Sequence, residues 1–174
     1  TAADDQKNEL ISANPDGDSG SGDSTTTDIS ADGRFLCFRS YASDLIEDDG
    51  NEFADIYVRD TLLQTIERVS VDSFGQETDA SSYEPKLSAD GRYVAFRSFA
   101  TNLVSNDTNG AYDIFVHDRW TGGIEKVSRH SNGYPSSDDC YDAAISNDGR
   151  HVAFWTLSSY LIPNDSNHKR DVFV

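Results

Sequence analysis

The feature that most constrains this chain is a segment that recurs at a fixed spacing. It reads Ile-Ser-Ala-Asp-Gly-Arg-Phe-Leu-Cys-Phe at residues 29–38 and returns with conservative changes at 87–96 and 145–154. Both intervals are 58 residues long, and the matches continue beyond the segment without gaps. A repeat of this length predicts that one supersecondary unit is built several times and stacked on itself.

Each repeat contains four short stretches that are typical of β-strands. Residues 93–98 and 113–118 alternate apolar and polar side chains, as half-buried strands do, and 86–88 and 124–128 are shorter. The Asp90-Gly91 pair and its repeat equivalents predict type I′ hairpin turns. Because no segment has a sustained 3.6-residue period, we expect an all-β fold of four-stranded antiparallel sheets, the blades of a β-propeller.

The repeat also predicts how the chain is divided. Residues 29–86 form repeat 1, 87–144 form repeat 2, and 145–174 form the first half of repeat 3. Residues 1–28 match the second half of the same unit, with Glu9–Ser12 as a lone outer strand. We therefore expect a single propeller segment of three 58-residue repeats that is cut in the middle of a blade.

The pattern Ser-x-Asp-Gly-Arg-Tyr-Val-Ala-Phe, followed by Asp-Ile-Phe-Val-x-Asp, resembles the TolB-type, WD40-like β-propeller repeat. The resemblance covers the whole chain, although the middle loop here is longer than in the commoner form of the family. It implies four-stranded blades and roles in scaffolding, in protein binding or beside hydrolases. It implies little about chemistry, because one fold serves many functions.

Charge and composition exclude several classes of partner. The net charge is −17, so the field of the protein repels nucleic acid and anionic membranes. No apolar run reaches the roughly 20 residues that cross a bilayer. The chain starts at Thr1 and contains no methionine, so we expect a processed, secreted protein in an extracellular or periplasmic location.

The loop before the third strand of each repeat carries a regular polar pattern of two aspartates and one asparagine. Its members are Asp49, Asn51 and Asp55, then Asp107, Asn109 and Asp113, then Asp165, Asn167 and Asp171. Hard oxygen donors at fixed offsets suit Ca²⁺, so these nine residues are the candidate metal ligands. The alternative is that they form Asx turns without metal. In the third loop, Lys169 and Arg170 could neutralise the carboxylates instead.

No sequence motif of a known catalytic machinery is present, and the four histidines occupy four different repeat positions. We therefore expect a protein that is not an enzyme. Trp120 stands where repeat 1 has Leu62, which makes it a candidate for binding a protein or glycan. Cys37 and Cys140 occupy non-equivalent repeat positions, which argues against a designed disulfide.

Two functions remain open. In the first, the chain is a non-catalytic, secreted, calcium-stabilised module that assembles with other copies of itself. The N-terminal strand of one copy would complete the C-terminal blade edge of the next, in a ring or a filament. In the second, it is a propeller fragment of a larger secreted hydrolase or of a TolB-like protein-binding protein.

Overall fold

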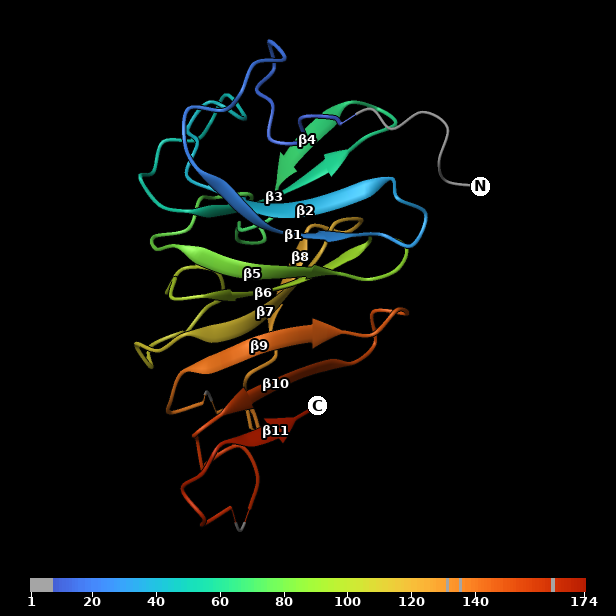
Figure 1. Ribbon diagram of the computed structural model, residues 1–174. Helices are drawn as coiled ribbons and strands as arrows, with labels where there is room; N and C mark the ends of the chain where they lie inside the picture. The colour runs from blue at the N-terminus through green and yellow to red at the C-terminus, as the bar shows by residue number, and fades with distance from the viewer. Residues whose placement is uncertain (1–7, 131, 135, 164) are drawn as a thin grey trace.

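The computed structural model describes residues 8–130, 132–134, 136–163 and 165–174, and these residues form three β-sheets stacked one after another (Figure 1). The first sheet contains β1 (Ser24–Ile29), β2 (Phe35–Ser40), β3 (Asp55–Asp60) and β4 (Thr65–Arg68). The second contains β5 (Ser82–Leu87), β6 (Tyr93–Ser98), β7 (Asp113–Asp118) and β8 (Gly123–Lys126). The third contains β9 (Cys140–Ile145), β10 (Val152–Thr156) and β11 (Asp171–Phe173).

Strands that follow one another in the chain are antiparallel neighbours in each sheet. The all-β fold with four-stranded antiparallel sheets is therefore confirmed in the first two sheets. The third sheet has three strands within the described residues. These residues include no helix that could span a membrane.

The first strand of each sheet starts earlier than the sequence suggested. We expected a short strand at 86–88, whereas β5 begins at Ser82. The reason is a bulge between Tyr83 and Lys86, where Glu84 adopts a φ of 54°. A bulge breaks the alternation of side chains, so the period-2 pattern does not show the first half of the strand.

The Asp-Gly turns also differ from the type I′ prediction, which requires positive φ at both residues. Only the glycine has positive φ, for example 77° at Gly33. The Gly33 N–H donates to the Ser30 carbonyl at 2.9 Å, and the Asp32 carboxylate accepts from the Ser30 hydroxyl at 2.6 Å. Asp32 therefore stabilises a type I turn that ends in a left-handed glycine.

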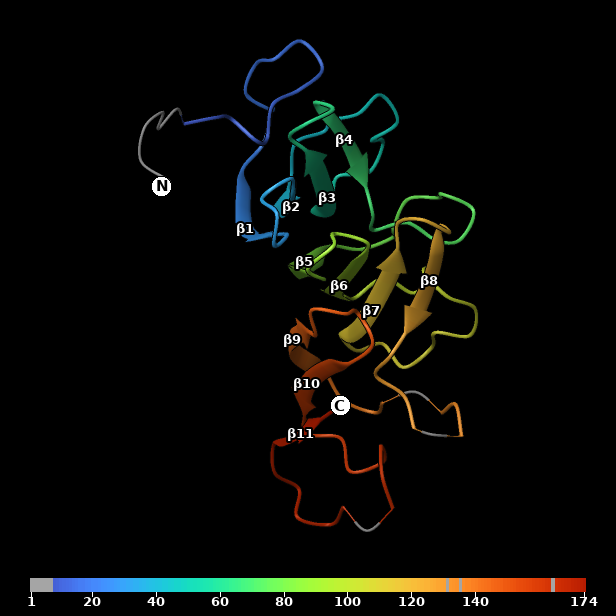
Figure 2. The same cartoon turned by 90° about the vertical axis from the view of Figure 1, so that its right-hand side faces the viewer.

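Apolar side chains from adjacent sheets form the core between them. Between the first two sheets, Cys37, Ile56 and Val58 pack against Val94 and Phe96. A second cluster joins the second and third sheets. Cys37 and Cys140 are both buried free thiols, and burial raises the pKa of Cys37 to about 12. The packing order places β1, β5 and β9 along one side of the stack and β4 and β8 along the other (Figure 2).

Each Asp-Gly turn joins the first two strands of its own sheet and is hydrogen-bonded to the equivalent turn of the adjacent sheet. Ala31 N donates to the Ala89 carbonyl at 2.9 Å, and Ala89 N donates to the Asn147 carbonyl at 3.0 Å. Gly91 lies directly against the ring of Phe35 in the preceding sheet. The turns therefore stack as a column and fix the spacing between the sheets.

Residues 8–23 form no strand, although we expected a lone strand at Glu9–Ser12. Residues 1–7 lie outside the described part of the chain. Ala13 and Ser19 form an isolated bridge, as Val71 and Glu77 do. Ile11 packs against the core cluster that contains Phe38. This segment thus repeats the geometry of the connection that follows β4.

The stacked turns predict a difference between two glycine variants. Gly33→Ala should cost about 1 kcal/mol, because it only places alanine in a left-handed conformation. Gly91→Ala should cost about 2–4 kcal/mol, because its Cβ would also overlap the ring of Phe35. Urea denaturation of both variants measures this difference, and equal losses would show that the turn column does not hold the sheets together.

Candidate functional site

The Asp/Asn loops of the first two sheets have the same internal geometry. Asp55 begins β3 and Asp113 begins β7, and both side chains are buried. The Asn51 amide nitrogen donates to Asp55 Oδ2 at 3.1 Å, and the Asn109 amide nitrogen donates to Asp113 Oδ2 at 2.7 Å. The other oxygen of each carboxylate accepts from a serine hydroxyl, that of Ser70 or Ser128.

A basic side chain from the fourth strand lies between the two carboxylates of each loop. Lys126 Nζ is 2.8 Å from Asp107 Oδ1 and 2.6 Å from Asp113 Oδ2. In the first sheet, Arg68 Nη1 is 3.3 Å from Asp49 Oδ1 and 3.6 Å from Asp55 Oδ2. The structure thus brings the predicted residues together, but around a cation of the protein itself.

Burial dominates the electrostatics of these loops. It raises the pKa of Asp113, while the hydrogen bonds from Lys126 and Ser128 act in the opposite direction. Burial likewise raises the pKa of Asp55, against the hydrogen bond from Ser70 and the charge of Arg68. Ionising these carboxylates therefore has a desolvation cost, which the neighbouring cation offsets in part.

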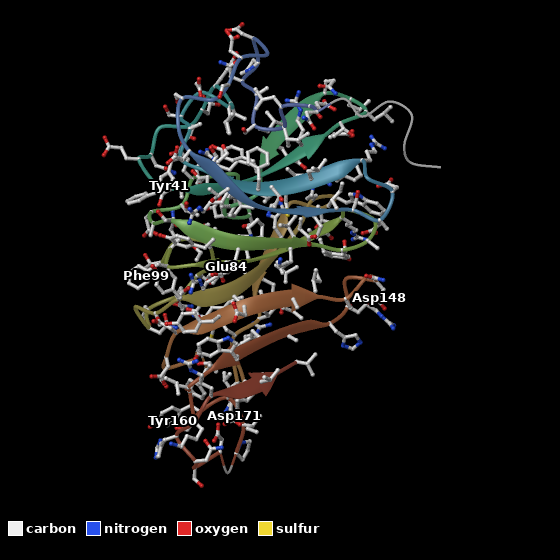
Figure 3. All side chains as sticks on the ribbon, in the orientation of Figure 1. Tyr41, Glu84, Phe99, Asp148, Tyr160 and Asp171 are labelled. Atoms are coloured by element: carbon white, nitrogen blue, oxygen red, sulfur yellow. The ribbon has the colours of Figure 1, made fainter. Side chains whose placement is uncertain are left out.

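The third loop is more open. Asp171 begins β11 and accepts a hydrogen bond of 3.0 Å from the Asn167 amide nitrogen. Arg170 and Asp171, both within the described residues, form no ion pair; the Arg170 guanidinium lies 4.6 Å from the ring centre of Trp155. Asp165 lies earlier in the same loop and is half-buried. Figure 3 shows Asp171 and Tyr160 at the C-terminal end of the stack.

The first two loops do not fit calcium well. Ca²⁺ takes about six to eight oxygen ligands, whereas here a lysine or arginine nitrogen lies among the oxygens. The asparagine presents its amino group to the aspartate. Among the described residues, no group of three or more His, Cys, Asp or Glu side chains could hold a metal ion. Calcium binding by these loops stays a prediction.

Trp120, the predicted binding residue, lies on the turn after β7. Its indole is 70% exposed, and Arg92 lies 4.5 Å from the ring centre. The side chain is therefore available to a ligand.

Sequence reasoning missed a row of arginines and aromatic rings that crosses all three sheets. Arg39 on β2 and Arg97 on β6 both lie against the ring of Tyr83, and Arg97 also lies against Tyr141. Tyr141 stacks on Trp155 with ring centres 4.3 Å apart. The signal was the repetition of arginine and tyrosine at equivalent positions, 39 with 97 and 83 with 141. The row links the sheets at the end where β2, β6 and β10 finish.

Comparison with known proteins identifies the fold. No family model matches the sequence, and no curated protein matches it. The solved structure of TolB from Acinetobacter baumannii is similar, with a TM-score of 0.51 and 15% identity over 87% of this chain and 29% of that chain. The β-propeller domain of the trilobed protease from Pyrococcus furiosus has a TM-score of 0.50 and 13% identity over 87% of this chain and 42% of that chain.

A structure from a study of two prolyl endopeptidases gives a TM-score of 0.52 and 16% identity, over 90% of this chain and 22% of that chain. The chain thus spans less than half the length of each of these proteins. At such identities the similarity concerns the fold. The chain is a β-propeller protein, and its fold is of the TolB-like kind, as the resemblance in the repeat implied.

The buried lysine gives a testable prediction. Lys126→Met should destabilise the protein by about 3–5 kcal/mol at neutral pH, because Asp107 and Asp113 lose their counter-charge while buried. The loss should shrink on acidification: a carboxylate whose folded-state pKa is raised binds a proton in the folded state first, so the folded state gains stability as the pH falls. Thermal unfolding as a function of pH measures both effects.

Lys126→Arg is the matched control, because arginine stands at the equivalent position in the first sheet. It should retain most of the stability. A Lys126→Met variant as stable as the parent at neutral pH would contradict the assigned role of this ion pair.

Proposed function

We propose that this chain is a non-catalytic β-propeller module that serves as a structural or binding scaffold. The observation that carries the proposal is that the repeated aspartates are buried and bonded to other side chains of the chain itself. A general acid or base must reach its substrate. Asp55 and Asp113 are buried and occupied by serine, asparagine and a basic side chain, so their role is to hold the loops to the fourth strand.

A location outside the cytoplasm is part of this proposal. The similarity to TolB is consistent with it. The strongly acidic composition suits a repetitive β-protein that must stay soluble.

Assembly with a second copy is the mode of scaffolding that we propose. In the first two sheets, the backbone of Ile56 and Ile114 faces the fourth strand: each N–H donates to a serine hydroxyl, and each carbonyl accepts from Val69 or Val127. Val172 of β11 is the repeat equivalent of these two residues. Its N–H and C=O therefore point to the position of a fourth strand, and its side chain is exposed.

The N-terminal segment is suited to that position. Ile11 packs on the cluster of Phe38 as Val69 packs on that of Phe96. The N-terminal segment thus packs on the first sheet in the same way as the β4–β5 connection packs on the second sheet. Residues 8–10, directly before Ile11, would pair with β11 of another copy, which would continue the stack from molecule to molecule.

The second candidate function is the propeller part of a larger hydrolase. Similar structures include the tricorn protease and prolyl endopeptidases, in which this chain covers only 11% and 22% of the length. In that case another part of the longer polypeptide fills the edge of β11, and the N-terminal segment of a second copy is not its specific partner.

Light scattering after size exclusion distinguishes the two. We expect association that increases with protein concentration, and we expect Val172→Pro to abolish it by removing an outward N–H. Val172→Ala is the control, because it keeps the N–H and should still associate. A monomer at every concentration would favour the second candidate.

The same measurement with a chelator tests the calcium part of the proposal. Arg68 and Lys126 already neutralise the first two loops, so any calcium dependence should come from the third loop, with Asp165, Asn167 and Asp171. Association that weakens on chelation and recovers with added Ca²⁺ would support calcium there. An unchanged assembly would remove calcium from the proposal.

A further inference from the structure

A cleft opens between the loops that follow β8 and β10. Its volume is about 680 Å³. The residues that bear on its chemistry are Asn109, His130, Asn132, Tyr134, Ser137 and Tyr160. Two loops of different repeats contribute its two tyrosines, and Figure 3 places Tyr160 at the same edge of the stack as Tyr41 and Phe99.

The cleft coincides with a departure from the repeat. At the equivalents of Tyr160, the first two repeats have Asp44 and Asn102. Asp44 accepts from the Ser21 backbone N–H at 2.7 Å, and Asn102 donates to the Glu77 carbonyl at 2.7 Å. In both cases a short polar side chain bridges to the loop of the preceding unit. Tyr160 replaces this bridge with an exposed ring, which gives the cleft one of its walls.

The rings in the cleft are free, unlike those of the arginine–aromatic row. Tyr134 is 70% exposed and Tyr160 is 69% exposed. Within the described residues, neither ring stacks on another ring or on an arginine. By contrast, Trp155 is in contact with both Tyr141 and Arg170. The two tyrosines therefore offer apolar ring faces to a ligand.

Among the described residues that line the cleft there is no aspartate, glutamate, lysine or arginine, and His130 contributes an imidazole. The chain has 31 acidic residues, yet the described residues lining this cleft include no carboxylate. Amides and hydroxyls such as those of Asn132 and Ser137 both donate and accept hydrogen bonds. The net charge of −17 repels anionic ligands. Without a carboxylate among the described lining residues, a cationic ligand finds no direct charged partner there either. The ligand that suits these groups best is neutral, rich in hydroxyls, and able to lay an apolar face on an aromatic ring.

We propose that this cleft binds a neutral oligosaccharide. The C–H face of a sugar ring packs on tyrosine, and its hydroxyls exchange hydrogen bonds with amides and hydroxyls. A volume of several hundred Å³ is typical of small-ligand sites. The inference rests on the proposed function to the extent that it treats the module as a binding scaffold, and it names the ligand class for one of its surfaces.

The test uses the whole chain and defined probes: cello-, malto-, chito- and manno-oligosaccharides, titrated by isothermal calorimetry. We expect at least one of these neutral series to bind. Tyr160→Asn, which restores the residue of the second repeat, should weaken that binding about tenfold or more. Tyr134→Ala should do the same. Because both side chains are exposed, neither substitution should lower the unfolding midpoint. An unchanged midpoint then shows that each variant is folded.

Phe74→Asn is the matched control, since it removes a highly exposed aromatic ring on another part of the surface and introduces the residue that the second repeat has at the equivalent position, Asn132. It should leave binding unchanged. The inference is overturned if none of the four series binds, or if binding survives Tyr160→Asn. It is also overturned if only an anionic probe such as polygalacturonate binds. These outcomes are independent of the association measurement with Val172→Pro, so the failure of one proposal is distinguishable from the failure of the other.

Discussion

Packing of one sheet on the next is the constraint on which the structure depends. Alternate residues of β2 point to opposite faces, so Phe38 packs toward the N-terminal segment and Cys37 packs toward the second sheet. A sheet with two apolar faces cannot bury both alone and needs a neighbour on each side. The repetition in the sequence follows from this, because each unit must present the same surface to its neighbour as the unit before it. The column of Asp-Gly turns then keeps the distance between sheets constant.

The same stacking explains the buried ion pairs. Asp55 and Asp113 begin the third strands at the point where the loops close over the sheet edge, so their carboxylates leave water when the sheets pack. A buried ion pair seldom adds net stability compared with an apolar replacement, because desolvation offsets its attraction. What it can supply is specificity: Lys126 reaches both aspartates only if β8 pairs with β7 in the observed register. We interpret the repeated cation as a device that aligns the fourth strand.

Much of the fold could be predicted from the sequence, because the repeat and the alternation in 93–98 and 113–118 are local signals. The start of β5 could not, since the bulge at Glu84 hides its alternation. The Asp/Asn pattern correctly marked residues that come together, for example Asn109 and Asp113. What neutralises these carboxylates is Lys126, which lies on another strand and is not part of the Asp/Asn pattern. Sequence spacing shows which oxygens gather at a turn, whereas the partner that neutralises them is set by tertiary packing.

A repeat protein separates the residues that build the fold from those that are free to change. The positions that stay constant here, such as the serines beside Asp55 and Asp113 or the Asp-Gly turns, are engaged in bonds that every unit needs. The positions that change must be explained one by one. Trp155 replaces an arginine yet stays within the arginine–aromatic row, so its change preserves packing. Tyr160 replaces a bridging side chain and leaves its ring exposed. Giving up an internal hydrogen bond lowers the stability of the fold, so a position that does so and exposes an aromatic ring is where we infer a binding function.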